Sequence, residues 1–123
     1  MRWALFDTNV VSYWMSGQPD FCAPLRSLLR EMSGAGVLLY VSAVTIQELA
    51  VACQMLGTWD RWHPWLVDRF GILPLTSRCA QRASLLQVAV GKPSRGTKSE
   101  RRAAKDVWFR DAAIVGTLCA NVE

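Results

Sequence analysis

Residues 37–56 of the chain, VLLYVSAVTIQELAVACQML, have the pattern of a buried strand that runs directly into a helix. Val37 to Val41 is a continuous apolar run, which is typical of strands in parallel sheets that are covered on both faces. Ser42 belongs to the residue types that cap helix N-termini, and apolar residues continue at helical spacing from Ala43 to Leu56. This stretch predicts one strand–helix unit of an α/β fold.

The segments on either side repeat this alternation. Further strands are expected at Trp3–Phe6 and Gly71–Leu75, and Gly91 to Ser99 is expected to be a loop. The expected helices are Val10–Met15, Phe21–Met32, Trp59–Phe70 with a break near His63-Pro64, Thr76–Val90, and a last one from Ala103 or Val107 to Ala120. Strands alternating with helices predict an α/β domain with a mostly parallel sheet flanked by helices. A length of 123 residues favours a single domain, residues 1–123.

The composition favours a folded protein without a membrane segment. Hydrophobic residues make up 51% of the chain and charged residues 20%, and no apolar run approaches the roughly 20 residues of a spanning helix. The first apolar stretch ends at Asp7, so no secretory signal is expected. The cysteines are widely spaced in apolar surroundings, as buried free thiols are, and this predicts a cytoplasmic protein. They are Cys22, Cys53, Cys79 and Cys119.

The positive charge of the chain is concentrated in one segment. The net charge is +4, and residues 92–105 contain one acid, Glu100, among six basic residues. Those six residues are Lys92, Arg95, Lys98, Arg101, Arg102 and Lys105. Such a segment is either a nucleic-acid contact or a solvated loop that keeps the protein soluble, and charge alone does not separate the two.

Three acidic residues stand out as candidate metal ligands. Asp7 directly follows the first strand, where ligand sites of parallel sheets lie, although it could equally cap the next helix. Glu48 is the one ionisable residue of a helix that is apolar nearly all round, a pattern that predicts burial; an ion pair with a distant arginine is the alternative. Asp111 is expected in the first turn of the last helix, where the helix dipole also favours an acid, and Asp106 is a reserve candidate.

If Asp7, Glu48 and Asp111 converge, they require a cation. Two carboxylates about 5 Å apart repel by roughly 3 kcal/mol at an effective dielectric constant of about 20. Ligands that are all oxygen favour Mg²⁺ or Mn²⁺ over zinc, and such ions support phosphodiester hydrolysis.

Three segments resemble the conserved motifs of PIN-domain ribonucleases, and in particular the VapC-type toxins of toxin–antitoxin pairs. The segments are Ala4–Val11 (ALFDTNVV), Val41–Leu49 (VSAVTIQEL) and Asp111–Thr117 (DAAIVGT). The resemblance implies a PIN-like α/β domain, Mg²⁺- or Mn²⁺-dependent cleavage of RNA, homodimers, and inhibition by a cognate antitoxin protein. It makes Asp7, Glu48 and Asp111 metal ligands, with Thr8 and Asn9 orienting the first acid or a bound water.

The resemblance also implies a further strand after the third motif, whereas this sequence stops at Glu123. The C-terminal strands of the family are therefore expected to be missing, and the first strand is expected at an exposed sheet edge. The alternative to an active enzyme is a shortened, catalytically impaired PIN remnant that binds an antitoxin or RNA.

Other enzyme classes fit the sequence less well. A phosphatase with Asp7 as nucleophile would carry a second acid where Asn9 stands. Phosphate-loop and dinucleotide fingerprints are absent, and the one histidine, His63, lies among aromatic residues and proline. The six tryptophans could stack RNA bases, but tryptophans at helical spacing more often form core or dimer contacts.

Overall fold

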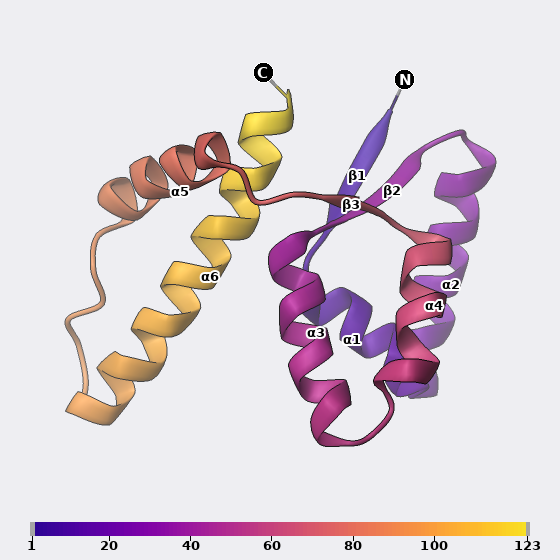
Figure 1. Ribbon diagram of the computed structural model, residues 1–123, viewed down its shortest axis with the longest axis horizontal. Coiled ribbons are helices and arrows are strands. Elements are labelled where there is room, and N and C mark those ends of the chain that lie inside the picture. Colours follow the sequence, from indigo (N-terminus) through magenta and orange to yellow (C-terminus); the bar gives the residue numbers. More distant parts are fainter. Residues whose placement is uncertain (1, 123) are drawn as a thin grey trace. The chain divides into compact units, whose positions relative to one another are not determined.

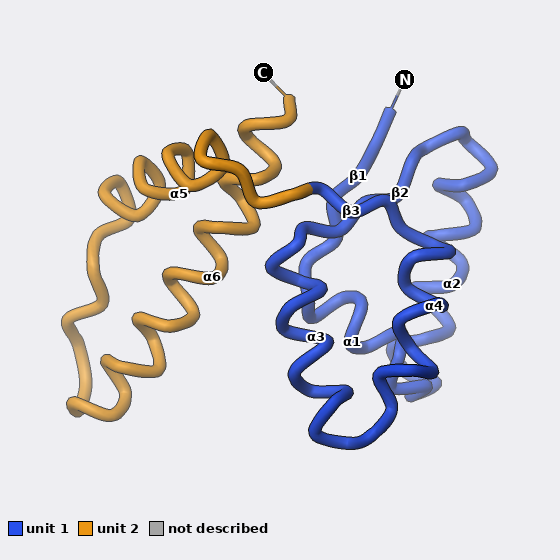
Figure 2. The backbone as a smooth tube through the Cα atoms, viewed as in Figure 1, with its two compact units in different colours: residues 1–73 blue, residues 74–123 orange. Residues whose placement is uncertain are grey.

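The computed structural model describes residues 2–122 and shows two compact units, residues 1–73 and residues 74–123 (Figure 2). That the whole of residues 1–123 forms one domain stays a prediction.

The first unit is an α/β structure built on a small parallel sheet (Figure 1). Its three strands pair in the order β1-β2-β3, with Phe6 opposite Val41 and Ser42 opposite Leu73. The elements are β1 (Trp3–Phe6), α1 (Thr8–Ser16), α2 (Pro19–Gly34), β2 (Leu38–Ser42), α3 (Ala43–Met55), α4 (Trp59–Arg69) and β3 (Gly71–Leu73). The predicted α/β class and parallel sheet are confirmed, and β1 is an edge strand among the described residues.

The core of the first unit lies between the sheet and its helices. One buried cluster joins residues from four elements or their ends, which are α1, β2, α3 and α4: Val11, Val41, Leu49, Leu66 and Phe70. Val41 and Leu66 are fully buried. These four elements are separated along the chain, so this core forms only when the strand and the helices assemble together.

Helix α4 differs from the sequence prediction, because it is not broken at His63-Pro64. It runs without interruption from Trp59 to Arg69, with Pro64 inside it. Proline removes one helical hydrogen bond. Burial of Leu66 within the helix and of Phe70 at its end offsets that cost, and tertiary packing overrides the local preference.

The second unit is a pair of helices, α5 (Ser77–Val90) and α6 (Lys98–Val122), joined by the loop at residues 91–97. They approach closely because small residues line their contact. A Cβ atom added to Gly116 would lie 2.6 Å from the Cys79 carbonyl oxygen and 2.7 Å from the Ala83 nitrogen. Glycine at position 116 therefore lets the backbones of α5 and α6 come together.

Helix α6 begins earlier than the sequence prediction of Ala103 or Val107. The Thr97 hydroxyl accepts a hydrogen bond from the Glu100 backbone N–H at 3.1 Å, so Thr97 caps the helix and Lys98 begins it. Thr97 and Glu100 have the spacing of a capping box. This signal was present in the sequence, but the predicted start at Ala103 or Val107 did not take it into account. The basic segment is therefore divided between the loop and the first turns of α6.

Two further expectations concern membranes and thiols. In residues 2–122, no helix is both long enough and apolar enough to cross a membrane. Burial is confirmed for Cys22, Cys53 and Cys79, whereas Cys119 is half-buried.

Candidate functional site

The carboxyl ends of β1 and β2 bring two helix starts together in the first unit. Asp7 follows β1 and begins α1, and Ser42 ends β2 and begins α3. Because the strands are parallel and Phe6 pairs with Val41, both junctions lie at the same edge of the sheet (Figure 1). This is the edge where open α/β sheets bind ligands.

A hydrogen-bonded contact joins the two helices at this edge. The Thr8 hydroxyl lies 3.0 Å from Thr45 Oγ1 and 3.0 Å from Glu48 Oε1. Thr45 is fully buried, and Thr8 and Glu48 are half-buried. The structure therefore brings Thr8 and Glu48 together although they lie 40 residues apart in the sequence.

Asp7 has the helix-capping role that was the alternative to a metal ligand. Its side chain is exposed, and its Oδ1 accepts a hydrogen bond from the Asn9 backbone N–H at 2.7 Å. Asp7 directly precedes Thr8, so its carboxylate lies at the same helix junction as the Thr8–Glu48 contact. Capping holds the carboxylate in one orientation, and it is compatible with binding a cation.

The burial expected around Glu48 is wrong. Helix α3 buries one stripe, consisting of Thr45, Leu49 and Cys53, while Met55 on another face is 83% exposed. The sequence pattern overstated burial because the described residues leave Val51 and Met55, on the second apolar face of α3, exposed. Glu48 lies at the boundary of the core and is hydrogen-bonded there by Thr8.

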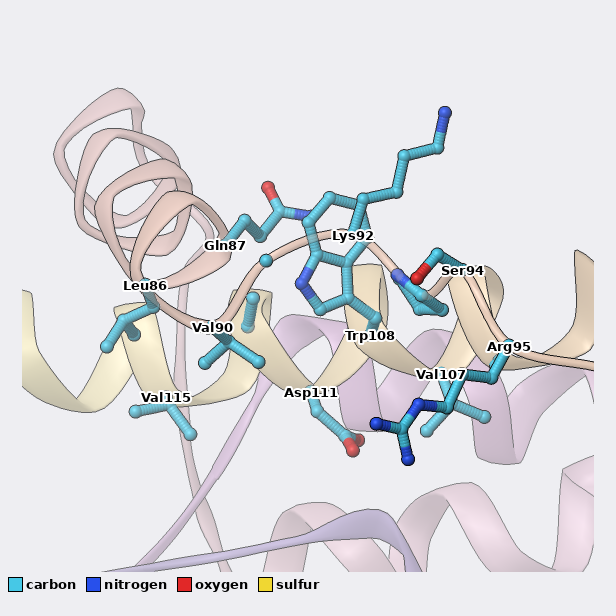
Figure 3. A pocket seen from close by; sticks show the side chains of 14 residues that line it. Leu86, Gln87, Val90, Lys92, Ser94, Arg95, Val107, Trp108, Asp111 and Val115 are labelled. Carbon is cyan, nitrogen blue, oxygen red and sulfur yellow. The ribbon is translucent and has the colours of Figure 1, made fainter. Parts of the chain in front are cut away.

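Asp111 lies in the second unit, and its expected place in a first turn is wrong. Since α6 begins at Lys98, Asp111 lies in the interior of the helix, where the dipole at the helix start does not act on it. Its exposed side chain lines a cavity of about 710 Å³ between α5, the 91–97 loop and α6 (Figure 3). Asp106, one turn earlier, is also exposed.

The same cavity contains a residue that the sequence did not single out. Trp108 is half-buried, and its Nε1–H has no hydrogen-bond partner within residues 2–122. Lys92 and Arg95 reach the cavity from the loop, and Figure 3 shows Arg95 and Asp111 extending to the same side of it. The sequence signal that could have identified Trp108 is its spacing, because it follows the basic residue Lys105 by three positions, about one helical turn.

The predicted loop of basic residues is corrected in part. Lys92 and Arg95 are in the loop, but the other four basic residues lie on the first turns of α6. These are Lys98, Arg101, Arg102 and Lys105. All six are exposed, and Arg101 donates a hydrogen bond to the Gly96 carbonyl at 2.8 Å.

The carboxylates of the first unit offer oxygen donors to a divalent metal. Within the described residues, no group of three or more His, Cys, Asp or Glu side chains is placed to hold a metal ion. In the first unit the nearby donors are carboxylate oxygens of Asp7 and Glu48 and the hydroxyl oxygen of Thr8. Oxygen donors of this kind suit Mg²⁺ or Mn²⁺, so the chemistry of the Asp7 and Glu48 side chains fits such an ion.

The second unit contains one thiol with a shifted pKa. Burial raises the pKa of Cys79, but a hydrogen bond from the Thr76 hydroxyl at 3.2 Å, together with others including one from Thr117, outweighs burial and lowers it below 9.0. Thr76 also caps α5 by accepting from the Cys79 N–H. The thiol is nearly inaccessible, which identifies it as part of the helix contact and not as a nucleophile.

Comparisons with protein-family models, with curated proteins and with solved structures find no significant match for the chain. The PIN resemblance therefore rests on the three short motifs alone.

Proposed function

We propose that the protein is a metal-dependent endoribonuclease of the PIN type that uses Mg²⁺ or Mn²⁺ to hydrolyse RNA. The observation that carries the proposal is the contact of Thr8 with Glu48, directly beside Asp7 at the carboxyl edge of the sheet. Two of the three motif acids thus belong to one helix junction, and a hydroxyl from the first motif orients the acid of the second.

Asp7 and Glu48 are the proposed metal ligands at this junction. The bound metal would supply a polarised phosphate and an activated water. The chain's own residues hold the carboxylates in place: the Asn9 N–H orients Asp7, and the Thr8 hydroxyl orients Glu48. Substitution of a residue that orients a metal ligand in this way typically lowers metal affinity or activity by about 10- to 100-fold.

Asp111, with Asp106 in reserve, is proposed as a further acid of the reaction on the basis of the third motif. The proposed RNA contact is the basic surface of the 91–97 loop and the first turns of α6, six exposed cations within residues 92–105. Phosphate contacts of this kind hold RNA without reading its sequence.

The biological setting is part of the same proposal. The resemblance to VapC-type toxins supports a cytoplasmic toxin that acts as a homodimer and is held by an antitoxin protein. The second candidate is a PIN remnant that binds RNA or antitoxin without cleaving. It is supported by the six exposed cations of residues 92–105, which suit RNA binding whether or not the chain cleaves.

The first test is RNA cleavage with added Mg²⁺ or Mn²⁺, compared with the same reaction in a chelator. Asp7→Asn and Glu48→Gln are suited to it, because asparagine still caps α1 and glutamine still accepts from Thr8. Each variant is expected to lose more than about 100-fold in rate, exceeding the effect of changing an orienting residue. Asp68→Asn, an exposed acid of α4, is the matched control and is expected to cleave normally.

Further outcomes separate the two candidates. Cleavage by Asp7→Asn at the normal rate contradicts the metal-site proposal. Absence of cleavage by the unaltered chain, together with RNA binding, supports the remnant. Asp111→Asn tests the third acid independently. In either case, Arg101→Gln with Arg102→Gln is expected to weaken RNA binding and reduce its dependence on salt.

A further inference from the structure

A second cavity, within the first unit, combines aromatic and cationic side chains. It has a volume of about 570 Å³, and its apolar floor includes Trp14, Leu39 and Trp65. Three arginines also line it: Arg26 and Arg30 from α2, and Arg69 from the end of α4. We call this cavity, defined by these six residues, the arginine pocket. It includes neither Asp7 nor Glu48.

Within residues 2–122, one of the three arginines of the pocket has an acidic partner and two have none. Arg26 and Arg30 are spaced i and i+4, so like charges lie on one face of α2, which is unfavourable in an isolated helix. Within residues 2–122 neither forms an ion pair, and no carboxylate lines the pocket. The ion pair of Arg69 within the described residues is with its exposed neighbour Asp68, at 4.0 Å. Three positive charges around one cavity favour an anion that carries more than one negative charge.

The two tryptophans that line the pocket pack against each other and against the core. Trp14 and Trp65 meet edge to face with ring centroids 4.9 Å apart, and both pack on the core cluster. The Arg69 guanidinium lies over the Trp65 ring at 4.5 Å and donates to the Trp65 carbonyl at 3.3 Å. Arg69 is thus already oriented beside an indole ring, so a bound ligand would have to pay little conformational entropy to fix this side chain.

We propose that the arginine pocket binds a nucleoside phosphate, either a free nucleotide or the phosphorylated end of a nucleic-acid strand. Guanidinium groups donate paired hydrogen bonds to phosphate, and indole rings contact planar bases. The volume falls within the usual range of about 300–1,000 Å³ for small-molecule sites. An aliphatic carboxylate supplies one charge for three arginines and no planar ring, so it matches less well.

The test is calorimetric titration of the full chain with adenosine 5′-monophosphate, adenosine and inorganic phosphate, in chelator so that no metal-dependent reaction intervenes. The monophosphate is expected to bind at least about tenfold more tightly than either part alone, because the base and the phosphate are recognised together. Its affinity is expected to fall as salt rises. Equal binding of inorganic phosphate and the monophosphate overturns the proposal.

Variants assign the binding to the pocket. Arg26→Gln combined with Arg30→Gln is expected to weaken monophosphate binding by at least about tenfold. Arg61→Gln is the matched control, since Arg61 is an exposed arginine of the same unit that stacks on Trp62 outside the pocket. Circular dichroism checks that all variants fold. Equal affinity in the Arg26/Arg30 variant and the control overturns the proposal.

Three further measurements identify the source of the ligand and distinguish this binding proposal from the nuclease proposal. If a short RNA with a 5′-phosphate binds more tightly than the same RNA with a 5′-hydroxyl, the ligand is a strand end. If the free monophosphate binds more tightly than either RNA, the ligand is a nucleotide. A glutamate-rich peptide that binds through Arg26 and Arg30 while the monophosphate does not overturns the proposal. Asp7→Asn is expected to bind the monophosphate normally, so failure of the nuclease proposal leaves this result unaffected.

Discussion

The two units of the molecule bury their apolar residues in different ways. The first unit joins large side chains from strands and helices, such as Val41, Leu66 and Phe70, into one cluster. The second packs two helices against each other through small residues, among them Ala83, Ala112 and Gly116. The comparison shows two routes to a fixed backbone: strand register in one unit, and close helix approach in the other. The stability of the first unit depends on the volume of its buried side chains. The stability of the second depends on small residues, such as Gly116, that leave room for the opposite backbone.

The largest expected effect is in the core of the first unit. Leu66→Ala removes a fully buried side chain and is expected to lower the free energy of unfolding of this unit by about 2–5 kcal/mol. Leu56→Ala, at a residue that is 78% exposed, is expected to change it by less than about 0.5 kcal/mol. Urea denaturation measures both. A loss below about 1 kcal/mol for Leu66→Ala would show that this unit does not depend on volume.

An intermediate effect is expected at the helix contact of the second unit. Gly116→Ala places a methyl group against the backbone at Cys79 and Ala83, and is expected to destabilise α5 and α6 by about 1–3 kcal/mol. Gly34→Ala in α2 is the matched control, because nothing lies within 4 Å of its added Cβ. It is expected to stabilise its helix by up to about 1 kcal/mol. Hydrogen exchange resolves the two units, and stabilisation by Gly116→Ala would contradict the close approach.

The smallest effect concerns the helix caps of the two units. Ser42→Ala removes a fully buried cap that accepts from the Thr45 N–H, and is expected to cost about 1–2 kcal/mol. Thr97→Ala removes an exposed cap of α6 and is expected to cost about 0.5–1 kcal/mol, because water replaces the lost partner. Thermal unfolding of both variants checks the order. Equal costs would mean that burial of the cap does not matter.

Most of the element order follows from local sequence. The strand at Trp3–Phe6, the Ser42 cap and the helix starting after Thr76 were predictable because caps and apolar periodicity act over a few residues. The start of α6 was also encoded, in the pairing of Thr97 with Glu100. Continuation of α4 through Pro64 was not, because it depends on the packing of Leu66 against other elements of the first unit.

The candidate site was predictable in its residues but not in its contacts. Asp7 and Glu48 were identified from a strand end and an apolar pattern, yet the pattern overestimated the burial of α3. Periodicity shows which face of a helix is apolar, but not whether anything covers that face. Asp111 was misplaced for a related reason, since the helix boundary before it was set too late.

By itself, the sequence determined the alternation of strands and helices, the caps that begin several helices, and the concentration of cations in residues 92–105. Only the tertiary structure decided that Thr8 meets Glu48, and that Arg26 and Arg30 share a cavity with Arg69. The physical reason is the sequence separation over which each interaction acts. Caps and periodicity act between residues a few positions apart, whereas these contacts arise from strand pairing and core burial that join distant parts of the chain.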